Sequence, residues 1–347
     1  MKPRLKPVSE QIIVITGASS GIGLTTAEMA ARAGARVILS SRNDAELLDA
    51  VTRIRAQGGR AFHIVADVAD PDAVDSIANF AIEQFGGIDT WVNNAGVGMY
   101  GKLTDTPLAD KRRLFEVDFW GVVHGCRTAV RHLRAAGGSI VNVGSVASDR
   151  AAPLLGIYSA AKHAVKGYTD ALRMELEHDG IPISVSLVKP ASINTPFIEH
   201  ARSHMDAEPE YMPPVYPPEE VARAILTCAE RPMRDVLVGG SAKFLSGMGK
   251  LAPRTLDRYL EATAFRQQMR GKRNDGIDAL DRPRRDGRRR GPTERHTMRR
   301  SAYTRISSSR FAQAWPLLAA GALAAGFAFG LPRRRTEENK AGNDATN

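Results

Sequence analysis

Thr16-Gly-Ala-Ser-Ser-Gly-Ile-Gly23 is the stretch that decides the fold of this 347-residue chain. It follows an apolar run, Ile12–Thr16, and leads into a helical pattern over Ile22–Ala33. Its three glycines permit a sharp turn and a close approach of the backbone to a ligand. The helix N-terminus that follows presents free amides, which suits a pyrophosphate. The alternative is a tight turn that binds nothing.

Apolar runs and helical patterns alternate along the rest of the first 250 residues. This alternation predicts an α/β, doubly wound (Rossmann) fold: a parallel seven-stranded sheet with helices on both faces and the ligand at the carboxyl ends of the strands. The expected strands are Ile12–Thr16, Arg36–Ser40, Ala61–Ala66, Thr90–Asn93, Ser139–Val143, Ile183–Val188 and Val236–Val238. The expected helices include Ile22–Ala33, Asp44–Gln57, Asp72–Phe85 and Ala160–His178.

A serine, a tyrosine and a lysine form the candidate catalytic group. Tyr158 and Lys162 are four residues apart, so they lie on one face of a helix; Ser145 follows a predicted strand. A tyrosine titrates near pH ~10, so its phenolate needs about 4 kcal/mol of stabilisation at pH ~7. An ammonium at about 5 Å supplies roughly 3 kcal/mol of this at an effective dielectric of ~20. The pattern indicates proton transfer coupled to hydride transfer.

These motifs together resemble the short-chain dehydrogenase/reductase family over about the first 250 residues. They occur in the order that the family has: Thr16–Gly23, Asp67-Val68, Asn93–Gly96, then Ser145, Tyr158, Lys162 and Pro190. The resemblance implies an oxidoreductase that acts on CH–OH or C=O groups with NAD(P). It also implies a homodimer or homotetramer.

The end of the second predicted strand indicates which cofactor is preferred. An NAD site usually has an acidic residue here, whereas this chain has Ser41 and Arg42, and a guanidinium pairs well with a 2′-phosphate. We therefore expect NADP(H); the alternative is a solvated arginine that opens a helix. By resemblance, the cofactor-binding residues are Gly17, Ser19, Ser20, Gly21, Ile22, Gly23, Ser41, Arg42, Asp67, Val68, Asn94, Ala95, Gly96, Tyr158, Lys162, Pro190, Ile193 and Thr195.

The resemblance also implies a role for each catalytic residue. Tyr158 is the general acid or base, Lys162 lowers the tyrosine pKa and binds the nicotinamide ribose, and Ser145 binds the substrate oxygen. The family usually completes a tetrad with an asparagine, where this chain has Asp118. An ionised carboxylate there would raise the pKa of Lys162 and oppose the phenolate.

Apolar residues after Thr195 are the candidates for substrate selection. The cations near them, Arg150, Lys189 and Arg202, form no obvious clamp for a carboxylate or phosphate, so we expect a small apolar substrate. An equal alternative is that these apolar residues pack against each other as a lid. The candidates are Phe197, Met205, Tyr211, Met212 and Tyr216, with Met99, Tyr100, Leu154 and Leu155 opposite them.

Most of the net charge of +10 lies near the C-terminus, because residues 1–250 contain 27 basic and 28 acidic side chains, and residues 251–347 contain 21 and 10. We expect a catalytic domain over residues 1–265, a basic disordered linker over 266–311, a membrane-spanning or interfacial helix over 312–331 and a polar tail over 332–347. The uncharged stretch Ala314–Leu331 would be about 27 Å long as a helix. Packing on protein is its alternative. Anionic lipids are likelier partners of the arginines than nucleic acid.

Two further observations bear on the site and on localisation. Cys126 and Cys228 have no metal-ligand spacing, so no metal is expected, and two cysteines favour a reducing compartment. No secretory signal is expected at the N-terminus. The prediction is a cytoplasmic NADP(H)-dependent oxidoreductase with a C-terminal membrane anchor. The alternative, motivated by Asp118, is a tethered nucleotide-binding regulatory or scaffold protein with little turnover.

Overall fold

The computed structural model describes residues 3–273, 276–284, 287–293 and 295–307. A seven-stranded, all-parallel sheet runs through the core, as the alternation predicted. In spatial order its strands are β12 (Asp235–Val238), β7 (Ile183–Pro190), β6 (Gly138–Val143), β4 (Thr90–Asn93), β1 (Ile12–Thr16), β2 (Arg36–Ser41) and β3 (Arg60–Val65). The chain reverses its winding direction between β1 and β4, which opens a crevice there at the carboxyl ends of the strands.

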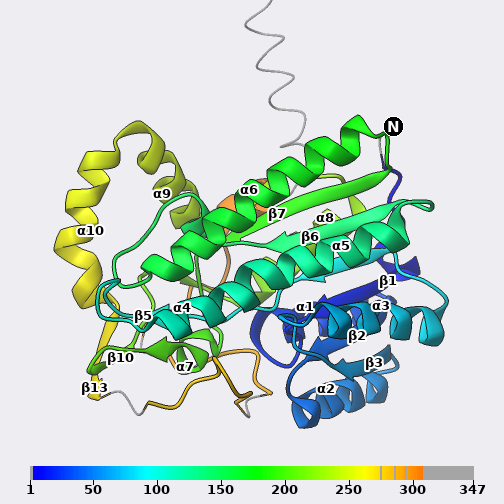
Figure 1. Ribbon diagram of the computed structural model, residues 1–347, viewed down its shortest axis with the longest axis horizontal. Coiled ribbons are helices and arrows are strands. Elements are labelled where there is room, and N and C mark those ends of the chain that lie inside the picture. The colour runs from blue at the N-terminus through cyan, green and yellow to red at the C-terminus, as the bar shows by residue number, and fades with distance from the viewer. Residues whose placement is uncertain (1–2, 274–275, 285–286, 294, 308–347) are drawn as a thin grey trace, which may run out of the picture. The chain divides into compact units, whose positions relative to one another are not determined.

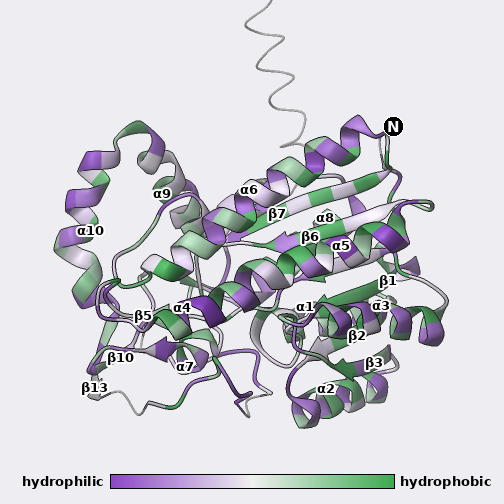
Figure 2. Cartoon of the chain, viewed as in Figure 1, coloured by the Kyte–Doolittle hydropathy of each residue, from purple (hydrophilic) through white to green (hydrophobic). Residues whose placement is uncertain are grey.

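Helices cover both faces of this sheet, because each central strand is apolar on both sides. One face packs against α1 (Gly21–Arg32), α2 (Asp44–Ala56) and α8 (Pro218–Glu230). The other, toward the viewer in Figure 1, packs against α3 (Pro71–Phe85), α4 (Leu108–Phe115), the π-helical turn η2 (Glu116–Trp120), α5 (Gly121–Leu133) and α6 (Gly156–His178). Figure 2 shows hydrophobic residues along β1 and a mixture of hydrophobic and hydrophilic residues along the covering helices.

Short elements beyond the sheet surround the carboxyl ends of its strands. Three small two-stranded sheets pair β5 (Met99–Tyr100) with β9 (Arg202–Ser203), β8 (Ser192–Ile193) with β11 (Val215–Tyr216), and β10 (Ala207–Pro209) with β13 (Met269–Arg273). The remaining helices are η1 (Val8–Glu10), η3 (Val146–Ser148), α7 (Phe197–His200), α9 (Gly240–Leu251), α10 (Pro253–Gln267) and α11 (Ala302–Ser307).

The described chain up to Arg305 belongs to one compact unit, whereas the sequence placed the end of the catalytic domain at residue 265 and a basic disordered linker after it. Backbone contacts explain this difference: Met298 donates to the Val215 carbonyl at 2.8 Å, and the Gly239 amide donates to Thr304 at 3.0 Å. The composition of the segment does not reveal such partners. Among the described residues no helix is long and apolar enough to cross a bilayer. The anchor predicted over 312–331 lies outside the described residues and remains a prediction.

A chain of buried amides ties the middle of the sheet to its covering helix. Asn93 on β4 donates to the side-chain oxygen of Asn142 on β6 at 2.8 Å, and Asn142 donates to Thr169 on α6 at 2.9 Å. The Trp91 indole donates to Asn93 at 2.8 Å. All four side chains are buried. A shift of β4 against β6 would leave these buried amides without partners, and an unpaired buried polar group is costly. The hydrogen-bonded network therefore fixes the register in which Asn93 lies opposite Asn142.

Replacing Asn142 tests this network. Asn142→Ala leaves the Asn93 amide without its acceptor and should lower the free energy of unfolding by about 1–3 kcal/mol, measured by urea denaturation. The control is Thr52→Ala, which removes an exposed hydroxyl from α2 and should change stability by less than about 0.5 kcal/mol. Equal effects of the two substitutions would contradict the role of the buried network.

Candidate active site

One cavity at the carboxyl ends of the strands brings together nearly all the predicted site residues. Gly23 and Asp118 are the exceptions: Gly23 lies behind the glycine-rich turn, and Asp118 lies behind Lys162. The residues that line the cavity as predicted are Gly17, Ser19, Ser20, Gly21, Ile22, Ser41, Arg42, Asp67, Val68, Asn94, Ala95, Gly96, Ser145, Tyr158, Lys162, Pro190, Ile193 and Thr195.

The glycine-rich turn after β1 leaves space that side chains would fill. Gly17 has a φ of +64°, and a Cβ there would lie 2.7 Å from the Ala95 Cα. A Cβ on Gly23 would lie 2.3 Å from the Gly17 carbonyl oxygen. The Asn94 side chain braces the turn by donating to the carbonyls of Thr16 (2.9 Å) and Gly17 (3.1 Å). The turn therefore has the shape of a cradle for a pyrophosphate at the N-terminus of α1.

Two arginines and one aspartate form the end of the cavity beyond β2 and β3. Arg113 donates to Asp67 at 2.5 Å, and Arg42 lies 3.9 Å from the same carboxylate. Burial alone would raise the pKa of Asp67, but the Ala69 amide and Arg113 outweigh it, so the pKa is lowered and Asp67 is ionised at neutral pH. Arg42 and Arg113 face Asp67 here, and the second carboxylate near Arg42, Asp281, is paired with Arg202, so this end favours an anionic ligand group.

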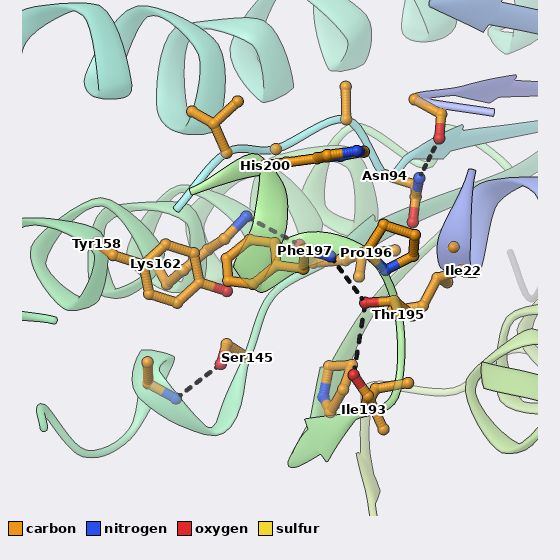
Figure 3. Close-up of a pocket in the computed structure, with 18 of the residues that line it drawn as sticks. Ile22, Asn94, Ser145, Tyr158, Lys162, Ile193, Thr195, Pro196, Phe197 and His200 are labelled. Carbon is orange, nitrogen blue, oxygen red and sulfur yellow. Dashed lines mark hydrogen bonds between the residues drawn. The ribbon is translucent and has the colours of Figure 1, made fainter. Parts of the chain in front are cut away.

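Ser145, Tyr158 and Lys162 meet at the opposite end of the cavity. Tyr158 and Lys162 project from α6, and Ser145 caps η3 directly after β6; Figure 3 shows the three close together. The Lys162 ammonium lies 5.6 Å from the centre of the Tyr158 ring. Burial raises the pKa of Tyr158, whereas Lys162 and a hydrogen bond with Ser145 lower it. The arrangement thus provides a proton-donating phenol with a cation beside it.

Asp118 sits directly behind this group. Its Oδ2 lies 3.2 Å from the Lys162 ammonium, and its Oδ1 accepts from the Val97 amide at 2.7 Å. The carboxylate is fully buried, and burial raises its pKa while Lys162 lowers it. The pKa of Lys162 is raised: burial opposes this, but Asp118 outweighs it, and Asp118 also raises the pKa of Tyr158. These directions match the electrostatic opposition that the sequence predicted for an aspartate at this position.

Apolar side chains continue the cavity beyond Tyr158. The Phe197 ring lies next to the Tyr158 ring (Figure 3), and the two ring centres are 5.5 Å apart. Four of the other predicted substrate residues also line the cavity: Tyr100, Leu155, Tyr211 and Met212. Four more do not line it, which corrects the prediction: Met99, Leu154, Met205 and Tyr216. Tyr216 is instead buried against the core, where its hydroxyl accepts from the Gly240 amide at 3.1 Å.

Several lining residues come from parts of the chain that the sequence did not connect with the site. Leu245 lies on α9, Leu260 on α10, and Gln268 directly after it. Ala279, Pro283 and Arg284 belong to the basic segment that was expected to be unpacked. None of these residues is part of a short motif. Only the apolar spacing within α9 and α10 indicated a helix face that needs a partner.

Comparisons with known proteins agree with this geometry. The family model for short chain dehydrogenases matches residues 11–206. An uncharacterized oxidoreductase of Bacillus subtilis, YxnA, is 44% identical over 270 residues, which cover 77% of this chain and 76% of the relative. A 3beta-hydroxysteroid dehydrogenase of Mediterraneibacter gnavus is 34% identical over 193 residues, covering 55% of this chain and 69% of that one. A short-chain dehydrogenase/reductase from Burkholderia phymatum, solved in complex with NAD, has a TM-score of 0.64 and 28% identity, over 72% of this chain and 95% of that one.

Removing the lysine tests the buried ion pair without relying on activity. Lys162→Met leaves the Asp118 carboxylate buried and unpaired, so the free energy of unfolding at pH 7 should fall by about 3–5 kcal/mol. The loss should shrink as the pH falls, because the raised pKa of Asp118 allows a proton to remove the charge. The double variant Lys162→Met/Asp118→Asn should recover most of it. Costs that simply add in the double variant would contradict the coupling.

Proposed function

The chain belongs to the short-chain dehydrogenase family and is an oxidoreductase, and we propose that its cofactor is NADP(H). The proposed reaction interconverts a carbonyl and an alcohol on a small apolar substrate, with Tyr158 as the general acid and base. The observation that carries the proposal is the single cavity that joins the glycine-rich turn and Arg42 at one end to Ser145, Tyr158 and Lys162 at the other. A dinucleotide fits this layout, because its phosphates need the backbone cradle and its reactive ring needs the proton donor.

When bound, the cofactor supplies or accepts the hydride. Ser145 and the Tyr158 hydroxyl hold the substrate oxygen, since both line the same wall of the cavity. In reduction, Tyr158 gives its proton to that oxygen, and in oxidation it takes the proton back. Lys162 stabilises the phenolate between these states through its nearby charge. Asp118 positions Lys162 and moderates its effect, because its own negative charge favours the protonated phenol.

The preference for NADP(H) rests on the groups around Arg42. No carboxylate stands at the end of β2, where Ser41 and Arg42 follow each other, and Arg113 adds a second guanidinium nearby. A 2′-phosphate would gain charge-assisted hydrogen bonds there. The Burkholderia relative was solved with NAD, so membership of the family does not by itself imply NADP(H), and the proposal rests on the local charge.

The proposed substrate is uncharged because the cations near the pocket already have partners. Arg150 pairs with Asp257, Lys189 lies 2.9 Å from Asp149, and Arg202 forms ion pairs with three aspartates. The walls are aromatic and aliphatic, with Tyr100, Leu155, Phe197, Tyr211, Met212, Leu245 and Leu260 among them. Such a pocket suits a hydrophobic ketone or secondary alcohol. The hydroxysteroid dehydrogenase among the relatives makes steroid-sized ketones a sensible part of a first panel.

Oxidation of NADPH by the purified full-length protein, against a panel of aldehydes, aliphatic ketones and steroid ketones, tests the proposed function. Turnover should fall at least about a hundredfold in Tyr158→Phe, because general acid catalysis contributes 10²–10⁴-fold. NADPH binding, followed by fluorescence titration, should remain. Turnover that survives in Tyr158→Phe would refute the assigned proton donor. Tight binding without turnover, in both the native protein and Asp118→Asn, would favour the regulatory alternative.

Arg42→Ala tests cofactor choice. The ratio of the NADPH to the NADH affinity should fall by about tenfold or more, because a charge-assisted hydrogen bond is worth about 1.5–3 kcal/mol. The ratio is the proper measure, since any other effect of the substitution on the cleft acts on both cofactors alike. Arg53→Ala removes the same charge from the outer face of α2 and should leave the ratio unchanged. An unchanged ratio in Arg42→Ala would contradict the proposed phosphate contact.

A further inference from the structure

The basic segment after β13 lies along the cofactor end of the cavity. We call its described residues, 277–284, 287–293 and 295–298, the strap. Ala279, Pro283 and Arg284 line the same cavity as the glycine-rich turn and Arg42. The family model ends at residue 206, so the strap lies outside the part of the chain that the model matches.

Backbone carbonyls of the strap accept hydrogen bonds from Arg42, the residue that we assign to the 2′-phosphate. Arg42 donates to the carbonyls of Leu280 at 3.0 Å, Asp281 at 3.3 Å and Ala279. A guanidinium has five N–H donors in a fixed fork. Both Nη1 hydrogens and one Nη2 hydrogen are directed at these carbonyls, so a phosphate that binds the terminal fork, Nη1 with Nη2, has to displace at least one of them.

The strap also contacts the pyrophosphate end of the site. The Gly21 amide, at the N-terminus of α1, donates to the Arg288 carbonyl at 3.0 Å. The Asn43 side chain, at the start of α2, donates to the Arg284 carbonyl at 3.0 Å. Free amides at the first turn of α1 are the donors that a phosphate would use. A strap carbonyl holds one of them.

Leu280 packs beside Val68, one of the residues that the resemblance assigns to the cofactor. Its side chain is fully buried, in the same apolar cluster as Ala66, Val68 and Val117. Its carbonyl also accepts from Arg113, at 3.4 Å, and Arg113 is paired with Asp67. Leu280 thus fixes the strap against the core next to the cofactor end of the cavity, which Ala279 on the strap lines.

The strap has anchors that lie outside the cofactor site. Arg202 pairs with Asp278 at 2.9 Å and with Asp281 at 2.8 Å. At the other end, Asn194 donates to Thr297 at 3.0 Å, and the Met298 amide donates to the Val215 carbonyl at 2.8 Å. The strap can therefore be weakened by substitutions that leave every cofactor-binding residue intact.

We propose that the strap is an intramolecular competitor of the dinucleotide: it closes over the adenosine half of the site, and the cofactor binds only when the strap has moved away. This inference rests on the proposed function. A closed strap lowers the fraction of binding-competent molecules, and the apparent Kd rises by the inverse of that fraction. A strap that is closed in nine molecules out of ten raises the Kd about tenfold.

NADPH titration of full-length variants tests the competition. Leu280→Ser removes the buried side chain and should lower the Kd for NADPH about tenfold. Asp278→Asn weakens the Arg202 anchor without touching the apolar core and should lower it in the same direction. The matched control is Ile277→Ser in the same segment, where the side chain is 58% exposed and the Kd should stay unchanged. Urea denaturation of each variant establishes that it is folded.

Limited digestion with trypsin gives the second measurement. The strap contains Arg284, Arg288, Arg289 and Arg290 as cleavage sites. If the strap and the cofactor exclude each other, NADPH should speed cleavage within it. Protection by NADPH would overturn the proposal, because a strap that closes over bound cofactor would be shielded. Equal NADPH affinities in all variants would overturn it too, while the proposed function would stand. No NADPH binding in any variant would overturn the proposed function and the competition together.

Discussion

The close approach of two backbone segments, the turn at Gly17 and the loop at Ala95, is the constraint on which the rest of the site depends. A parallel sheet brings the carboxyl ends of β1 and β4 to one edge, and only a residue without a Cβ fits between them at Gly17. Asn94 then fixes the turn through two carbonyls. The same loop leads to Val97, whose amide holds Asp118. The positions of the glycine-rich turn and of Lys162 thus both depend on one contact between two loops.

A second constraint acts through charge in the buried part of the site. Lys162 has one anion beside it, Asp118, and in the proposed reaction it faces a second, the Tyr158 phenolate. Burial magnifies each interaction, since few solvent dipoles screen it. Asp118 therefore keeps Lys162 charged and in place. At the same time its negative charge partly cancels the stabilisation that Lys162 gives to a phenolate at Tyr158. Stability and proton transfer draw on the same ion pair, and an asparagine in this position would separate the two.

The sequence predicted the sheet and the residues of the cavity because these depend on local patterns. Apolar runs fixed the strands to within a residue or two, and the turn at Gly17 and the pair Tyr158 and Lys162 depend on spacing alone. The predicted substrate-pocket residues were right only in part: Tyr211 lines the cavity, but Tyr216 faces the core, because a short loop has no periodicity that distinguishes the two. The packing of residues 276–305 was missed for a related reason. The contacts that the described residues of this range make with Arg42 and Asn43 use backbone carbonyls, which every residue has, so composition gives no sign of them.

The uneven charge of the chain bears on how tightly the basic segment is held. Its arginines pair with carboxylates on the surface of the core: Arg288 with Glu199 at 2.8 Å, Arg289 with Glu28 at 3.4 Å, and Arg290 with Glu219 at 3.0 Å. These guanidinium groups are about half exposed, and exposed ion pairs contribute only about 0–1 kcal/mol each and weaken with salt. Many weak contacts, together with one buried leucine, hold a segment in a defined place at a modest free energy. A ligand with several phosphate charges can compete with a segment held this weakly. It offers Arg42 and the Gly21 amide at the start of α1 a stronger acceptor than the strap carbonyls that they now bind.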